Sequence, residues 1–100
     1  MASVVLKGEF TATGQSSWVE LRSDFNLSIK GGQGTVQVER SFDGGTTVFV
    51  VSKNTDGDPA SYTLNNNSVS LQGIEPESKV SYRFNCTAYT AGTIPYRLSQ

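Results

Sequence analysis

The chain lacks the residues from which most catalytic and metal-binding sites are built. Among its 100 residues there is no histidine, one cysteine (Cys86) and one methionine (Met1). These absences exclude Ser-His-Asp and Cys-His nucleophiles, histidine-ligated metals and haem, and the paired cysteines of zinc and redox motifs. A single cysteine also excludes a disulfide within the chain, and therefore a disulfide-stapled secreted scaffold. We expect a protein with no cofactor and no bound metal.

The chain is also poor in net charge and in long apolar segments. Eight Lys and Arg residues stand against nine Asp and Glu residues, so the formal net charge is −1 and no basic surface for nucleic acid is expected. No apolar run approaches the roughly 20 residues of a membrane span. Lys7 interrupts the first apolar run, which argues against a signal peptide. These patterns predict a protein without nucleic-acid or membrane partners, made and folded in the cytoplasm.

What the chain does contain is hydrophobic alternation with a period of two residues, which is typical of half-buried strands. The longest run covers 80–88, and similar runs cover 4–10, 18–22, 25–29, 36–42 and 94–98. Clusters of Gly, Asn and Asp separate these runs, and no segment carries a helical stripe. The pattern predicts an all-β fold with no significant helix. Specifically, it predicts a single antiparallel β-sandwich over residues 1–100, immunoglobulin- or fibronectin III-like or jelly-roll-like, with about seven to nine short strands.

Several aromatic residues share the phase of the aliphatic ones, and we expect them in the core together with the reduced thiol of Cys86. They are Phe10, Phe25, Phe42, Tyr82, Phe84 and Tyr96.

Residues 41–47, SFDGGTT, fit the S-x-D-x-G-x-T pattern of the Asp box. The aspartate of such a motif can accept hydrogen bonds from backbone amides across the turn, and the glycines supply positive φ angles. In sialidases and related propellers the motif recurs, whereas here it occurs once in a chain too short for a propeller. We therefore predict a hairpin-stabilising turn formed by Ser41, Asp43, Gly45 and Thr47, and no catalytic site there.

One run, 47–51, is apolar on both faces. Two interpretations are open: a central strand covered by a neighbouring loop, or a strand whose second face is buried by another subunit. Trp18, Phe49 and Tyr89 fall on the phase opposite to the core, as does Val51. Outward aromatic residues on a small sheet suit a protein interface or a flat sugar-binding platform. Candidate interface residues are therefore Trp18, Phe49, Val51 and Tyr89.

The nine carboxylates could in principle supply the acid–base pair of a glycosidase. Glu39 lies on the polar phase of a strand and Glu75 in a turn, where we expect carboxylates to be solvated and to keep ordinary pKa values. Asn54, Asp56 and Asp58 have the alternating spacing of a calcium loop, but no Gly-x5-Glu continuation follows, which favours an exposed turn. The sequence thus predicts neither an enzyme nor a metal site.

Two resemblances to known families appear in the sequence. Residues 74–78 resemble the corner before strand F of fibronectin type III domains, with Val80 at the position of the corner tyrosine and Tyr82 two residues later. Residues 38–45 (VERSFDGG) and 82–89 (YRFNCTAY), with 75–76, 92–93 and 96–99, resemble small β-sandwich virion structural proteins of tailed bacteriophages.

The second resemblance implies a head decoration or cement protein on the capsid surface of the virion, made in the host cytoplasm. It also implies two partners: the major capsid protein, and further copies of the chain in a trimer or dimer. The candidate interface residues would form the contacts with these partners. The alternative is a carbohydrate- or receptor-binding module of a phage tail or fibre, with Trp18, Tyr62 and Tyr89 as stacking platforms.

Overall fold

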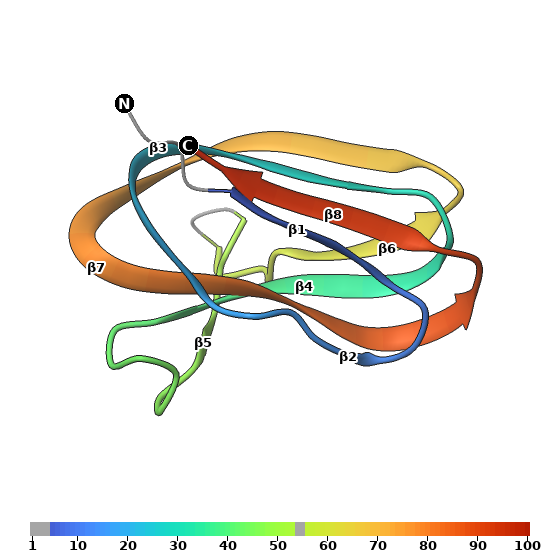
Figure 1. Ribbon diagram of the computed structural model, residues 1–100, viewed down its shortest axis with the longest axis horizontal. Coiled ribbons are helices and arrows are strands. Elements are labelled where there is room, and N and C mark those ends of the chain that lie inside the picture. The colour runs from blue at the N-terminus through green and yellow to red at the C-terminus, as the bar shows by residue number, and fades with distance from the viewer. Residues whose placement is uncertain (1–4, 54–55) are drawn as a thin grey trace.

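The computed structural model describes residues 5–53 and 56–100. In these residues the chain forms strands and no helix, so the all-β prediction is confirmed (Figure 1). The strands are β1 (Val5–Phe10), β2 (Gly14–Gln15), β3 (Val19–Lys30), β4 (Gln33–Ser41), β5 (Phe49–Val50), β6 (Ser61–Asn65), β7 (Ser68–Ala91) and β8 (Ile94–Ser99). The described residues contain no helix with the length and apolar character needed to cross a bilayer.

All the strands belong to one antiparallel sheet of eight strands in the order β1-β8-β3-β7-β4-β5, with β2 on β7 and β6 on β4. β7 changes partner along its 24 residues. Its residues 68–75 pair with β3 alone, whereas beyond the bend residues 80–82 pair with the start of β3 and residues 81–91 pair with β4. The predicted pair of sheets is therefore one sheet that folds over on itself.

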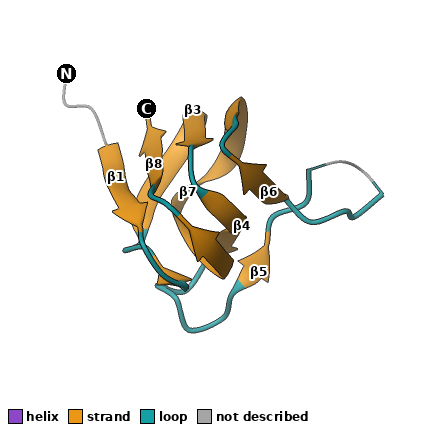
Figure 2. Cartoon of the chain, turned by 90° about the vertical axis from the view of Figure 1, so that its right-hand side faces the viewer, coloured by secondary structure: helices purple, strands orange, loops and turns teal. Residues whose placement is uncertain are grey.

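The fold-over occurs where both long strands bend. In β3 the register with β7 shifts between Leu21 and Ser23, and Ser23 has a φ of 59°. In β7, Lys79 has a φ of 61° between the two paired stretches. The bends divide the sheet into a first layer, formed by β1, β8 and the facing parts of β3 and β7, and a second layer around β4 (Figure 2).

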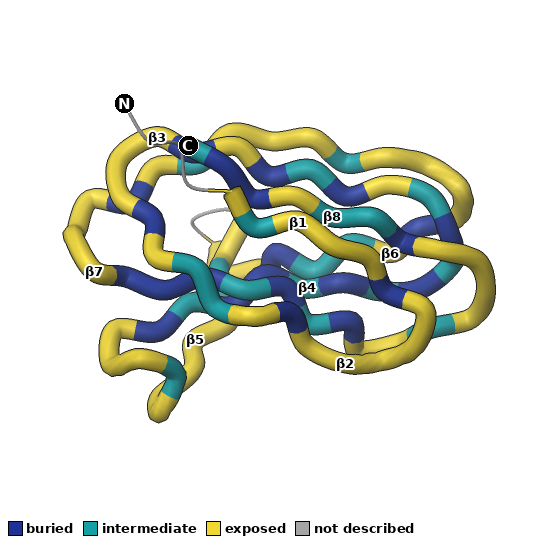
Figure 3. The backbone as a smooth tube through the Cα atoms, in the orientation of Figure 1, coloured by how far each residue is buried: buried dark blue, intermediate teal, exposed yellow. Residues whose placement is uncertain are grey.

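The hydrophobic core lies between the two layers, and Figure 3 shows buried residues on several strands of the sheet. Ring contacts join the layers directly: Phe25 lies 5.0 Å from Tyr82, and Phe84 lies 5.2 Å from Tyr96, between ring centroids. Cys86 is buried here as a free thiol, as its position in the alternation predicted. The core residues are Phe10, Leu21, Phe25, Leu27, Ile29, Val36, Val38, Ala60, Leu64, Val80, Tyr82, Phe84, Cys86, Ile94 and Leu98.

Phe42 is not a core residue, contrary to the sequence-based prediction. Its side chain is 46% exposed. The alternation fails at this position because β4 ends at Ser41, so Phe42 is the first residue of the turn and no longer follows the pleat. It packs against Phe49, with ring centroids 5.8 Å apart, and beneath the guanidinium of Arg40 at 4.7 Å.

The run 47–51 is not a central strand. Only Phe49 and Val50 form a strand, β5, and they pair with Glu39 and Arg40 of β4 at the end of the sheet. Both side chains are exposed. Hydrophobicity on both faces therefore marks an edge strand, and the interpretation that another subunit covers it stays a prediction.

Candidate functional site

Exposed apolar side chains gather on two segments that face each other across a groove. Phe42, Phe49 and Val50 come from the β4–β5 hairpin, and Leu71 and Ile74 come from β7. We call these five residues the apolar patch. Ile74, at 72% exposure, is the most exposed of them.

The groove runs between β5 and residues 68–75 of β7. One part, of about 470 Å³, is lined by Phe42, Phe49, Val50 and Ile74. An adjoining part, of about 270 Å³, is lined by Leu71. The two parts share Phe25, Val51, Ser52, Gly73 and Tyr82 as lining residues, so they form one trough with core side chains at its base.

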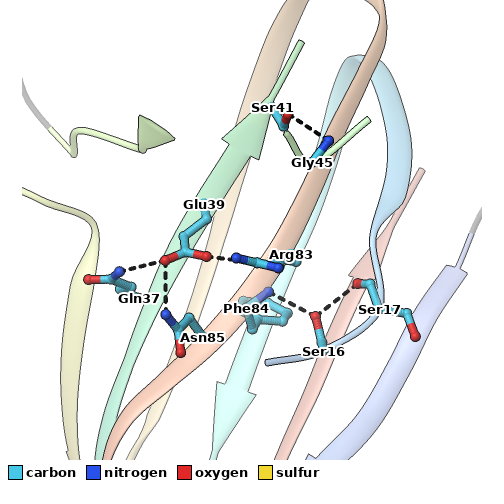
Figure 4. Close-up of polar contacts among 9 residues, drawn as sticks. All are labelled: Ser16, Ser17, Gln37, Glu39, Ser41, Gly45, Arg83, Phe84 and Asn85. Carbon is cyan, nitrogen blue, oxygen red and sulfur yellow. Dashed lines mark hydrogen bonds and ion pairs between the residues drawn. The ribbon is translucent and has the colours of Figure 1, made fainter. Parts of the chain in front are cut away.

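The Asp-box turn holds one wall of this groove in place. The hydroxyl of Ser41 donates to Asp43 Oδ1 (2.7 Å) and accepts from the Gly45 amide (2.9 Å; Figure 4), while the Thr47 amide donates to Asp43 Oδ1 (2.8 Å). Gly44 and Gly45 have φ angles of 73° and 104°. The bonds from Thr47 and Ser41 lower the pKa of Asp43 to about 2. The turn thus fixes how the chain returns to place Phe49 beside Arg40 at the edge of the sheet.

A buried charged network lies beneath the groove. Glu75 is 1% exposed, and its carboxylate accepts hydrogen bonds from Arg40 Nη2 (2.5 Å), the Tyr82 hydroxyl (2.7 Å) and the Glu77 amide (3.0 Å). Burial and the bond to Glu75 raise the pKa of Tyr82 far above its usual range. Arg40 Nε is buried and has no hydrogen-bond partner among the described residues.

The expectation that Glu75 is solvated is therefore wrong. The Glu-Pro-Glu sequence was expected to form a turn, which is also wrong: residues 75–77 lie within β7, and the bend of this strand points the Glu75 carboxylate inward. There it meets Arg40 and Tyr82, two donors that only the folded chain brings near it.

Glu39 is a second carboxylate that was expected to be solvated and is in fact buried, at 4% exposure. It accepts from Arg83 Nε (2.7 Å), Asn85 Nδ2 (2.9 Å) and Gln37 Nε2 (2.7 Å) on the outer face of the second layer (Figure 4). Burial acts to raise the pKa of Glu39, but the bonds from Asn85, Arg83 and Gln37 outweigh it, and the pKa is lowered. Neighbouring polar side chains, rather than water, solvate this carboxylate.

The four candidate interface residues do not share one surface. Phe49 and Val51 line the groove. Trp18 lies elsewhere, with its ring 4.2 Å from the guanidinium of Arg83. Tyr89 packs against the core, and its hydroxyl donates to the Gly92 carbonyl (2.5 Å).

The predicted sugar platform is not assembled either, since Tyr62 and Tyr89 both pack against the core while Trp18 lies against Arg83. The groove residues that sequence reasoning missed are Arg40, Phe42, Leu71 and Ile74. The run 47–51 was the available signal for this surface, because it marked the hairpin as apolar. It could not show which distant segment lies opposite.

Residues 5–53 and 56–100 contain no group of three or more acidic, cysteine or histidine side chains close enough together to hold a metal ion. Asn54, the first residue of the calcium-like spacing, lies outside the described residues. Comparison with models of known protein families and with curated proteins finds no match.

Proposed function

We propose that this protein is a non-enzymatic structural component of a tailed-phage virion: a head decoration or cement protein that binds the major capsid protein on the capsid surface. The phage assignment rests on the resemblance of residues 38–45 and 82–89 to such proteins. The structural observation that supports it best is the apolar patch on the rim of a small all-β body. Exposed apolar surface concentrated at one place is typical of a site of protein contact.

The rest of the body suits a stiff scaffold. Polar side chains pair across neighbouring strands, as in Ser28–Ser70 (3.2 Å), Thr35–Thr63 (3.3 Å) and Gln33–Asn65 (3.1 Å). Such a body can present the same contact surface at many equivalent positions of a shell. Repeated weak contacts then add up through avidity, provided that the protein is a trimer or dimer whose copies bind together.

The function is tested by sedimenting the protein with expanded capsid shells. We expect a stable oligomer that co-sediments with shells and saturates at a fixed ratio to the major capsid protein. A monomer that ignores shells and binds glycans would overturn the proposal and favour the receptor-binding alternative.

Phe49→Asp tests whether the groove takes part. Because Phe49 is half exposed, we expect the variant to fold and to associate at least tenfold more weakly with itself or with shells, since a charge replaces an apolar contact. Val5→Asp is the matched control, because Val5 is similarly exposed but lies on β1, away from the groove. A Phe49→Asp variant that fails to fold, or one that associates like the control, would contradict the assignment.

A further inference from the structure

One edge of the sheet is long and unprotected. Residues 68–75 of β7 pair with β3 on one side, and no described strand pairs with them on the other. From Ser68 to Ile74 this edge has no charged residue and no proline. Native proteins usually blunt such edges with charges, prolines, bulges or very short strands, because the free N–H and C=O groups can pair with another chain.

The other edges carry charges or are shorter. β1, at the opposite end of the first layer, has Lys7 and Glu9 exposed along it. β5 and β2 are two residues long, and β6 is five. The edge at 68–75 is therefore the one best able to accept a further strand.

This edge also forms a wall of the groove, since Leu71, Gly73 and Ile74 line it. A strand added to the edge would lie beside the apolar patch and cover it. Backbone hydrogen bonds and burial of the patch would then act together, as in other complexes formed by strand addition.

We propose that two copies of this chain associate edge to edge through residues 68–75 of β7, antiparallel about a two-fold axis, with the apolar patch of each copy buried against the other. The inference rests on the self-association included in the proposed function and names the surface responsible for it.

The absence of charge favours a second copy as the occupant. A two-fold axis places the central residue of an antiparallel edge opposite its own copy, so a charge near the centre of the edge would repel the same charge on the other copy. Residues 68–74 avoid this repulsion. If the two copies form one continuous sheet, paired residues must point to the same face of it. The two-fold axis must then pass through a residue position, such as Leu71 or Gln72, and not between two residues.

The exposed area fits the same occupant. With exposed fractions between 44% and 72%, the five patch residues expose apolar surface on the order of 500 Å². A standard interface buries roughly 800 Å² per partner, of which about 65% is apolar in homodimers, and this also amounts to roughly 500 Å². The patch alone supplies the apolar part of one dimer interface.

Leu71→Lys tests the proposal by introducing two like charges at the axis. We expect the wild type to be a dimer by light scattering after gel filtration, and Leu71→Lys to be a folded monomer with an unchanged circular dichroism spectrum. Val5→Lys, on the protected β1 edge, is the control and should remain dimeric. A monomeric or trimeric wild type, or a Leu71→Lys variant that remains dimeric, overturns the inference.

Cross-linking keeps the test decisive if Leu71→Lys does not fold. Paired residues on adjacent antiparallel strands have Cα atoms about 4.5–5.5 Å apart, which a disulfide can span. On mild oxidation, Leu71→Cys or Gln72→Cys, whichever lies on the axis, should form a covalent dimer. The native thiol of Cys86 is buried and contributes no background. Lys7→Cys on β1 is the control, because its covalent dimer measures the background of cross-linking by random collision.

If neither edge variant cross-links above the Lys7→Cys background, the edge pairing is wrong. The outcome is separable from that of the proposed function, because no shells are used. A wild-type monomer that still binds shells would overturn only the edge dimer. A cross-linked dimer that ignores shells would overturn only the decoration role.

Discussion

The carboxylate of Glu75 is buried although it directly precedes a proline in a charged segment. Three donors compensate for the water it has lost, namely Arg40, Tyr82 and the Glu77 amide. Removing one member of a buried charged group is costly because the remaining groups stay desolvated. The network is therefore a point of structural vulnerability beneath an otherwise apolar groove.

Tyr82→Phe removes one of these three hydrogen bonds and keeps the ring. Because the acceptor is a charged group, we expect the free energy of unfolding to fall by about 2 kcal/mol, measured by urea denaturation. Tyr96→Phe is the control, since the Tyr96 hydroxyl has no hydrogen-bond partner within the described ranges. Equal losses in the two variants would show that the bond to Glu75 contributes nothing.

Asp43 makes the stability of the turn depend on pH. Its pKa is about 2 in the folded chain and ordinary, 3.8, when unfolded. Its contribution is therefore complete above the unfolded pKa and is lost as the pH falls through the folded pKa. We expect the difference in urea midpoint between the wild type and Asp43→Asn to be largest near about pH 6 and to shrink near about pH 2. A difference that does not change with pH would refute this.

At the scale of elements, the β4–β5 hairpin depends on two adjacent glycines in different surroundings. Both have positive φ angles, but a Cβ on Gly45 would lie 2.7 Å from Trp18 Nε1, whereas one on Gly44 would meet nothing within 4 Å. The same substitution at the two positions therefore separates backbone strain from collision.

Gly44→Ala should lower the free energy of unfolding by about 1 kcal/mol, through left-handed backbone strain alone. Gly45→Ala should lower it by more and should shift the emission of Trp18, the single tryptophan, because the ring must move off its position near Arg83. Urea titrations followed by fluorescence compare the two variants. Identical losses with unchanged emission would show that Trp18 does not pack on the turn.

Elements with many large apolar residues could be predicted from the sequence, and those without them could not. The alternation over 80–88 and 94–98 identified the second half of β7 and most of β8. Residues 68–75 of β7 and all of β6 were missed, since small and polar side chains there outnumber aliphatic ones and weaken the period-two signal. The bend at Lys79 also hid the continuity of β7, because the phase of burial changes there.

At the scale of the whole molecule, the groove brings together residues 42–50 and 71–74, which only the folded sheet places side by side. Their apolar character can be seen in the sequence, but their proximity cannot, because it depends on β7 leaving one layer and entering the other. The burial of Glu39 and Glu75 has the same origin, since each carboxylate meets its arginine across strands.

Cys86 offers a readout of global stability. Its thiol is 1% exposed, and burial raises its pKa. We expect an aromatic disulfide reagent to label native protein very slowly, and labelling to speed up with urea in parallel with unfolding seen by fluorescence, because the core must open first. Lys7→Cys, exposed on β1 and outside the proposed dimer edge, should label at once. Rapid labelling of the native wild type would mean that the core opens locally.

The position of β8 affects how the chain reaches this fold during synthesis. In the sheet, β8 lies between β1 and β3 and pairs with both. β1 and β3 come from the first third of the chain, so they cannot be joined until residues 94–99 have left the ribosome. At roughly 5–20 residues per second, β1 and the edge of β3 that β8 will cover stay unpaired for several seconds. The first layer can close only after that point, and on polysomes crowded nascent chains would be open to mispairing with one another.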